Sequence, residues 1–387
     1  MDGGRTGMSA AAEAAARAGV DALRRGDARG ARAGLEQAIT LGMKPEPWFL
    51  LAQASRLMGD DEREKHALDK LLEGDPRHAG ALVLRGDLAA RHKDNRAATS
   101  FYSQALYVAA SGLPIPDSIR AELPRVQAWL DSASRDYSAH LNQTLRNAGF
   151  GTPPPRLAEA IAILTGEAEV YLQQPTSFFY PGLPHTQFYE REQFDWAAEI
   201  EAAAVTIRSE LEAFIADSEA AFRPYVERVE GRPNKAHSLL DDPRWSALHL
   251  WREGGPTEHA ARFPATMKAL EVAPMPVIKA RSPSALFSML RPGAHILPHN
   301  GMINTRLICH LPLIVPGDCA LRVGNQTRAW DPGELTIFDD SIEHEAWNRS
   351  TETRIILLFE IWRPELSTEE RAALTAMYEA IGLYDAE

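Results

Sequence analysis

The sequence predicts an α+β protein, in which an all-α helical repeat domain is followed by a β-barrel or β-sandwich domain with flanking helices. Residues 10–110 repeat with a period near 34, which is typical of stacked helix pairs. From about residue 276 the pattern changes to short β-type runs separated by regular turns, which favours a barrel or sandwich over a parallel sheet. With 387 residues, 45% of them hydrophobic, the chain has enough material for two or three domains. We expect one domain at 10–150 and a second at 155–387.

The N-terminal repeat consists of small residues and aspartates that recur at steps of 33 and 34 residues. The repeated positions are Gly19, Ala52 and Gly86 in the first set and Asp27, Asp60 and Asp94 in the second. Small residues let paired helices approach closely, and the aspartates lie in the turns that reverse the chain. The pattern resembles tetratricopeptide repeats, and a plain antiparallel helical bundle is the alternative. Stacked repeats form a concave surface that binds peptides or proteins, so a protein partner is expected there.

The rest of the chain divides at turn-forming segments. A helix is expected over 118–147, and the GFGTPPP segment after it predicts a domain boundary. Helical spacing returns at 155–174 and 195–216. The β-type runs that follow are FSML, TRLICHLPLIV, CALRVG, QTRAW, ELTIF, HEAW and RIILLFEIW. Ser367 and Glu370 have the spacing of a capping box that opens a final helix.

Charge and composition exclude several classes of protein. Lys plus Arg total 41 and Asp plus Glu total 53, so the net charge is −12. This balance argues against general nucleic-acid binding and against adhesion to an anionic membrane. The chain has two cysteines, so no disulfide framework is expected. It shows neither a secretory signal nor an apolar run long enough to cross a membrane, and we expect a cytoplasmic location.

Two histidines and an arginine suggest a metal site together with an anion site. His299 ends a strand-like run, His344 lies 45 residues later, and Arg354 follows His344 by ten residues. In a small barrel, two imidazoles from opposite strands can converge inside the mouth, and imidazole suits Fe, Zn, Cu and Ni. An interior arginine suits a carboxylate. Ser288, on an earlier strand, could donate its hydroxyl to the same anion.

Strand parity points to the same interior. In TRLICHLPL, Arg306, Ile308 and His310 share one face, and Leu307, Cys309 and Leu311 share the other. Buried arginine and histidine side chains need partners, and a bound anion is one candidate.

Three segments of this region together resemble the aspartyl/asparaginyl β-hydroxylases: PHNGMINTRLICHLPL, TIFDDSIEHEAWN and RIILLFEIWRPEL. The resemblance covers residues 280–366. It implies a double-stranded β-helix of the jelly-roll or cupin type, with a barrel core at about 276–365. It also implies Fe(II) as the metal, 2-oxoglutarate as the co-substrate and O2 as the oxidant.

The resemblance assigns roles to individual residues. His299 and His344 match the two iron ligands, and Gly301 stands where most such oxygenases carry a carboxylate ligand. Arg354 and Ser288 match the pair that holds the distal carboxylate of 2-oxoglutarate.

Two further positions in the TRLICHLPL run concern the co-substrate. His310 matches a residue near the chelating end of 2-oxoglutarate. The animal enzymes carry an arginine two residues before that histidine, where this chain has Ile308. Arg306 lies on the same face, so it is a candidate to bind the co-substrate in its place, or to bind the substrate.

The expected function is hydroxylation of an Asp- or Asn-like residue in a peptide or protein, or of a small amino-acid-like acid or amide. The reaction would be coupled to decarboxylation of 2-oxoglutarate to succinate and CO2. Two alternatives stay open. One is halogenation, because Gly301 leaves room for chloride on the metal. The other is a non-catalytic repeat protein with a metal-binding cupin module, in which Zn takes the two histidines.

Overall fold

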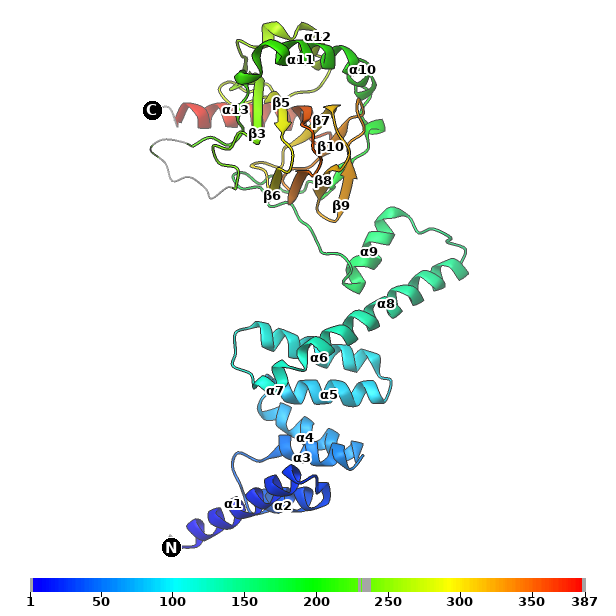
Figure 1. Cartoon of the computed structure of the whole chain (residues 1–387), viewed down its shortest axis with the longest axis vertical. Coiled ribbons are helices and arrows are strands. Elements are labelled where there is room, and N and C mark those ends of the chain that lie inside the picture. The colour runs from blue at the N-terminus through cyan, green and yellow to red at the C-terminus, as the bar shows by residue number, and fades with distance from the viewer. Residues whose placement is uncertain (1–2, 229–230, 232–237, 385–387) are drawn as a thin grey trace. The chain divides into compact units, whose positions relative to one another are not determined.

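The computed structural model describes residues 3–228, 231 and 238–384, and the chain divides into two compact units, Met1–Ala168 and Glu169–Glu387. Figure 1 shows the helical first unit and the β-rich second unit. Among the described residues, no helix has the combination of length and apolar character that crossing a bilayer requires.

The first unit contains helices and no strand in its described part. Its helices are α1 Gly3–Arg24, α2 Ala28–Thr40, α3 Trp48–Leu57, α4 Asp61–Gly74, α5 Ala79–Arg91, α6 Asn95–Ala110, α7 Asp117–Arg120, α8 Leu123–Asn147 and α9 Pro155–Thr165. The pairs α1–α2, α3–α4 and α5–α6 are the three units of the predicted repeat.

The three repeated aspartates begin the second helix of each pair. The side chains of Asp27, Asp60 and Asp94 accept hydrogen bonds from backbone N–H groups three residues ahead, at 2.9, 3.2 and 3.0 Å. Each carboxylate therefore satisfies an N–H group that the first helical turn leaves without a partner. This explains why an aspartate recurs at these steps.

The repeated small residues lie where the two helices of a pair touch. A Cβ atom at Gly19 would lie 2.8 Å from the Leu35 side chain, and one at Gly86 would lie 2.5 Å from the Tyr102 ring. Ala52 fills the matching position in the middle pair and is fully buried. Close helix contact therefore accounts for the small residues.

The division between the units lies after the boundary expected at 150–155. The helix expected over 155–174 ends at Thr165, because Gly166 adopts a left-handed conformation with φ of +75°. Ser134 on α8 donates a hydrogen bond to the Thr165 carbonyl, so α9 packs on α8 as part of the first unit.

The second unit contains two antiparallel sheets. The larger has eight strands, in the order β1-β10-β7-β12-β5-β3-β2 with β4 beside β3, and the smaller has four, in the order β6-β11-β8-β9. The strands are β1 Phe188–Tyr189, β2 Arg223–Pro224, β3 Trp245–Arg252, β4 Gly255–Pro256, β5 Ala285–Leu290, β6 His295–His299, β7 Arg306–Ile314, β8 Cys319–Val323, β9 Gln326–Ala329, β10 Thr336–Phe338, β11 His344–Asn348 and β12 Arg354–Trp362. This is the predicted jelly-roll type of architecture.

Strands from before residue 276 complete the larger sheet, so a barrel core at 276–365 is too short. β3 pairs with β5 over most of its length, from Trp245 opposite Leu290 to Trp251 opposite Ala285. The β-type runs predicted after 276 are all strands in the structure, whereas β3 was not predicted.

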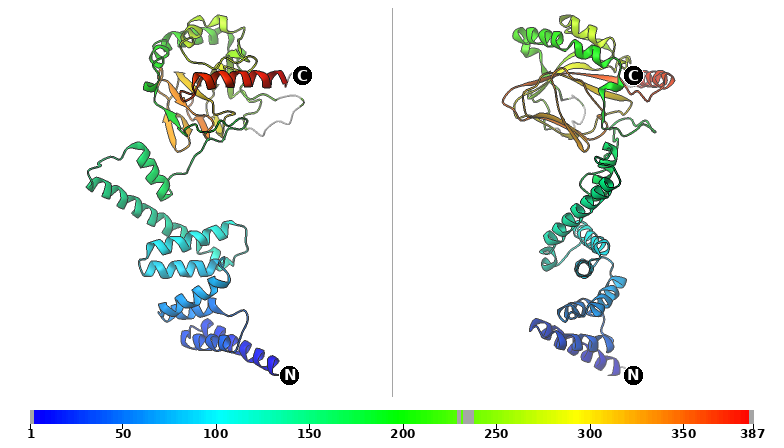
Figure 2. Two further views of the ribbon diagram at one scale, coloured as in Figure 1. Left: turned by 180° about the vertical axis from the view of Figure 1, so that it is seen from behind. Right: turned by 90° about the vertical axis from the view of Figure 1, so that its right-hand side faces the viewer.

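Helices cover the outer face of the larger sheet. These are α10 Ala197–Ala202, α11 Ala204–Ser218 and α12 Pro264–Leu270, drawn in green in Figure 2. Ile207 and Leu211 of α11 pack against Phe287 and Leu357 of the sheet. In place of the single helix expected over 195–216, the structure has two helices, α10 and α11, which meet at Ala203.

The final helix, α13 Thr368–Tyr384, begins as predicted. The Glu370 carboxylate accepts hydrogen bonds from the backbone N–H and the hydroxyl of Ser367, and the Glu370 N–H donates to the Ser367 hydroxyl. This is a reciprocal capping box. Leu374 and Tyr378 then pack against Trp362 at the end of β12.

Candidate active site

The inner faces of the two sheets enclose a cavity of about 110 Å³. Apolar side chains from both sheets form much of its wall, among them Ile296, Leu321, Ile356 and Leu358. The structure brings all six predicted site residues to this inner cavity: Ser288, His299, Arg306, His310, His344 and Arg354.

Strand parity explains how β7 contributes to the cavity. Arg306, Ile308 and His310 line it, whereas Cys309 points into the core under the helices and is fully buried. The predicted division of this strand into a polar inner face and an apolar outer face is therefore confirmed.

His299 and His344 form a contacting pair of imidazoles. His299 ends β6 and His344 begins β11, the two residues are directly paired in the smaller sheet, and their ring centroids lie 4.2 Å apart. Nδ1 of His299 lies 2.8 Å from the Leu297 carbonyl oxygen, and Nδ1 of His344 lies 3.1 Å from that of Ile342. Since a carbonyl only accepts, each Nδ1 carries the proton, and the lone pair of each ring is on Nε2.

Burial keeps the second imidazole neutral. It lowers the pKa of His344 to about 3, and the neighbouring His299 contributes to the same shift. A histidine must be neutral to bind a metal through its lone pair. The donor set therefore fits a metal that accepts two imidazoles.

No carboxylate completes a three-residue metal site in the described part of the chain, where no group of three His, Cys, Asp or Glu side chains could hold an ion. At Gly301 the reason is steric. A Cβ atom there would overlap the carboxylate of Asp340, and the Gly301 N–H donates to the Asp340 carbonyl at 2.6 Å. The space beside Gly301 is already filled by an acidic side chain, which disfavours a chloride ion there.

Arg306 is held by two carboxylates at the edge of the inner cavity. Its guanidinium lies 3.1 Å from Asp340 and 2.7 Å from Glu360. Burial raises the pKa of Asp340 to about 6. The two carboxylates balance the charge of Arg306, and its Nη1 is left without a hydrogen-bond partner among the described residues, so this position suits a neutral acceptor atom better than a further anion.

Arg354 has a different environment. It is 1% exposed, its Nη1 donates to the Ser288 carbonyl at 3.4 Å, and its guanidinium lies 4.7 Å from the centre of the Trp330 ring. Among the described residues no acidic side chain pairs with it, and its Nε has no hydrogen-bond partner. Burial lowers the pKa of Arg354 to about 10. An uncompensated buried guanidinium is costly, so this position fits an anionic ligand.

Ser288 and His310 provide neutral polar groups in the same cavity. The indole N–H of Trp245 donates to the Ser288 hydroxyl oxygen at 3.2 Å, so the hydroxyl hydrogen can point elsewhere. His310 is buried, its Nδ1 has no hydrogen-bond partner, and burial lowers its pKa well below the usual value. Both groups can therefore bind the polar atoms of a ligand.

Sequence reasoning missed three residues of the site: Tyr225, Trp245 and Glu360. Tyr225 and Trp245 stack with ring centroids 4.1 Å apart and line the inner cavity. Both precede residue 276, and no motif marks them. Asp340 lies inside the recognised FDDSIEHE segment, and the structure places its carboxylate against Arg306.

Comparison with known proteins gives the following. Residues 201–364 match the model of a family described as aspartyl/asparaginyl beta-hydroxylase. The human aspartyl/asparaginyl beta-hydroxylase is 38% identical over 142 residues, which are 36% of this chain and only 19% of the human protein. The ornithine lipid ester-linked acyl 2-hydroxylase of Rhizobium tropici is 34% identical over 190 residues, 48% of this chain and 63% of that protein. A cupin 2 conserved barrel domain protein from Salinispora arenicola aligns with a TM-score of 0.22 and 15% identity, over 38% of this chain and 98% of that one.

Proposed function

Because residues 201–364 match the model of the aspartyl/asparaginyl β-hydroxylase family, we propose that the protein is an Fe(II)- and 2-oxoglutarate-dependent hydroxylase. The overall reaction consumes the acceptor, O2 and 2-oxoglutarate and yields the hydroxylated acceptor, succinate and CO2. One oxygen atom of O2 enters the new hydroxyl group and the other enters succinate. The acceptor is an Asp- or Asn-like residue of a peptide or protein, or a small amino-acid-like acid or amide.

The observation that carries this proposal is the combination of Arg354 with the imidazole pair in one cavity. The buried guanidinium has no acidic partner in the described part of the chain, so a dicarboxylate would supply the missing charge. Two imidazoles next to it provide the donors for a metal. A co-substrate that is both a metal chelator and a dicarboxylate accounts for both features.

Each residue then has a role. His299 and His344 would hold Fe(II), which when bound activates O2 and oxidises the acceptor C–H bond. Arg354 binds the distal carboxylate of 2-oxoglutarate in a charge-assisted hydrogen bond, and the Ser288 hydroxyl donates to it. His310 contacts the chelating end. The apolar wall of the inner cavity excludes water from the reacting groups.

Arg306 takes a supporting role rather than the co-substrate role considered from the sequence. Its contacts with Asp340 and Glu360 keep the Asp340 carboxylate beside Gly301. This filled space is also the reason that we favour hydroxylation over halogenation. A zinc-binding module without turnover would leave the buried Arg354 unexplained.

The test is anaerobic titration with Fe(II) and 2-oxoglutarate, followed through the metal-to-ligand charge-transfer absorption band. Succinate release is then measured in the presence of O2. We expect the wild-type chain to show the band, and His299→Ala and His344→Ala to lose both the band and succinate release.

His295→Ala is the matched control for these variants. His295 lies on β6 like His299, but its ring faces Glu345 at 2.6 Å and does not line the inner cavity. This variant should keep the band and the succinate release. Full succinate release in His344→Ala would remove the metal assignment.

A further inference from the structure

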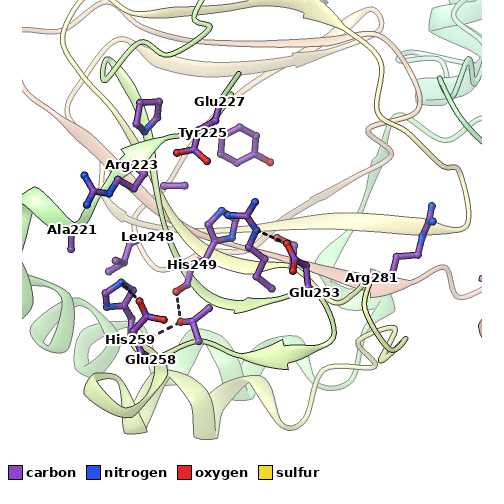
Figure 3. A pocket seen from close by; sticks show the side chains of 15 residues that line it. Ala221, Arg223, Tyr225, Glu227, Leu248, His249, Glu253, Glu258, His259 and Arg281 are labelled. Carbon is purple, nitrogen blue, oxygen red and sulfur yellow. Dashed lines mark hydrogen bonds and ion pairs between the residues drawn. The ribbon is translucent and has the colours of Figure 1, made fainter. Parts of the chain in front are cut away.

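A second cavity, of about 550 Å³, adjoins the proposed active site, and we call it the outer cavity. Its walls come from β2 and the segment that follows it, from β3, and from the turn at 252–259 (Figure 3). Residues 223–227 are extended here, since Arg223 and Pro224 pair with β3 and the Tyr225 N–H donates to the Trp245 carbonyl. Alternate side chains of an extended segment point to one side, which brings Arg223, Tyr225 and Glu227 to this outer cavity.

The Tyr225 side chain lies between the two cavities. It lines the outer cavity and the inner cavity, and its ring is held by stacking on Trp245. On β3, Ala247 lines the outer cavity and is the direct partner of Ser288, which lines the inner one. A molecule in the outer cavity is therefore one strand away from the proposed co-substrate site.

Among the described residues that line the outer cavity, Arg223 and Arg281 are cations without an acidic partner and Glu227 is an anion without a basic one, and Arg281 lies over the Tyr378 ring at 4.1 Å, which leaves Arg223 as the cation on the same extended segment as Glu227. Arg252 pairs with Glu253 at 3.3 Å, and His259 pairs with Glu258 at 3.7 Å. For Arg223 and Glu227, by contrast, no hydrogen bond or ion pair occurs within the described residues. Figure 3 shows both side chains at the same end of the cavity as Tyr225.

The two arginines that line the inner cavity among the described residues, Arg306 and Arg354, leave no cation for an acidic acceptor. Arg306 is neutralised by Asp340 and Glu360, and the position two residues before His310 is the apolar Ile308. If Arg354 binds 2-oxoglutarate, as the proposed function requires, the part of the acceptor that reacts must be uncharged. Its charged groups must then bind outside the inner cavity.

We propose that the outer cavity binds the head group of a free amino acid whose side chain is uncharged, with Arg223 on its carboxylate and Glu227 on its ammonium group. The side chain extends past Tyr225, so that its C–H bond faces the inner cavity. This inference rests on the proposed function and narrows its substrate class to a small zwitterion.

The experiment supplies the full chain with Fe(II), 2-oxoglutarate, O2 and an equimolar mixture of the twenty free L-amino acids. Mass spectrometry then identifies any amino acid that gains one oxygen atom. The responding amino acid is retested as its N-acetyl amide, which lacks both charges, and its binding is measured by calorimetry in the presence of 2-oxoglutarate. We expect one oxygen to be gained by an amino acid with an uncharged side chain, and the N-acetyl amide neither to bind nor to react.

Two charge-neutralising variants test the assigned residues. Arg223→Gln and Glu227→Gln should each raise the KM for the amino acid at least about tenfold, because each removes one charge-assisted hydrogen bond. Arg208→Gln is the matched control, since Arg208 pairs with Glu212 on α11 and does not line the outer cavity. Its KM should equal that of the wild-type chain.

The outcomes separate this inference from the proposed function. If 2-oxoglutarate binds with Fe(II) but no free amino acid gains oxygen, or the N-acetyl amide reacts equally well, the inference is wrong and the proposed function stands. An unchanged KM in both variants also overturns it. If 2-oxoglutarate does not bind at all, both fail together.

Discussion

Arg354→Met should make the protein more stable while abolishing its response to 2-oxoglutarate. The guanidinium is buried without an acidic partner in the described residues, and burial lowers its pKa from 12.5 to about 10. At pH 7 the arginine is protonated in both the folded and the unfolded chain. The lowered pKa means that the folded chain holds this charge at a cost of roughly 3 kcal/mol.

The net gain is smaller, because methionine also loses favourable contacts. The guanidinium lies over the Trp330 ring, a contact worth about 1 kcal/mol. Methionine fills irregular space with little strain, so we expect the free energy of unfolding to rise by about 2 kcal/mol. For a unit of this size that corresponds to an increase in Tm of roughly 5 °C.

Ligand binding, by contrast, should stabilise the wild-type chain more than the variant. Fe(II) with 2-oxoglutarate at 100 times its Kd should stabilise the wild-type chain by about 2.7 kcal/mol. Loss of the charged partner should weaken 2-oxoglutarate binding at least about 30-fold, so the variant should gain little from the same addition. Differential scanning calorimetry of the full chain, without and with both ligands under anaerobic conditions, measures all four states.

Arg363→Met is the matched control. Arg363 is as deeply buried as Arg354, but it pairs with the buried Asp339 at 2.7 Å. Removing it leaves a buried carboxylate without its partner and should destabilise the protein by about 3–5 kcal/mol. If Arg354→Met were equally destabilising in the absence of 2-oxoglutarate, the arginine would be a structural group, and the argument for an anion site would fail.

Three further variants test helix packing in the first unit and the burial of a histidine in the second. Gly86→Ala should destabilise the first unit in urea denaturation, because its Cβ would lie 2.5 Å from the Tyr102 ring, whereas Gly74→Ala, with open space around its Cβ, should be neutral or stabilising by up to about 1 kcal/mol. Burial lowers the pKa of His249 from 6.5 to about 4, so the unfolded chain takes up a proton between these pH values and the folded chain does not. The free energy of unfolding should therefore fall by up to about 3 kcal/mol as the pH drops from 6.5 to 4, and His249→Gln should flatten this dependence in urea denaturation at several pH values.

The sequence predicted those features that follow from local periodicity. On β7 the alternation of residues alone assigned Arg306 and His310 to one face and Cys309 to the other, and the structure agrees. The period near 34 located the helix pairs, because a close helix contact needs a small residue at the same place in each pair. Both signals are contained within a short window of sequence.

Features that depend on contacts between distant segments were not predicted. Arg306 was considered for the co-substrate because parity placed it inside, but parity says nothing of the Asp340 and Glu360 carboxylates that neutralise it. The position of Tyr225 and Trp245 beside the inner cavity was not predicted, for the same reason. Trp245 on β3 and Tyr225 just after β2 precede the recognised motifs. The pairing of β3 with β5 brings Trp245 to the site, and the hydrogen bond from the Tyr225 N–H to the Trp245 carbonyl places Tyr225 beside it.

The pairing of β3 with β5 also decides where the second unit can be shortened. Every residue of β5 is buried, and β3 occupies one of its two hydrogen-bonding edges. A shortened chain that starts at residue 276 would lack β3 and would present this apolar edge to solvent, which is the kind of surface that templates association between molecules. Such a fragment keeps all the motif residues and would nevertheless be expected to aggregate.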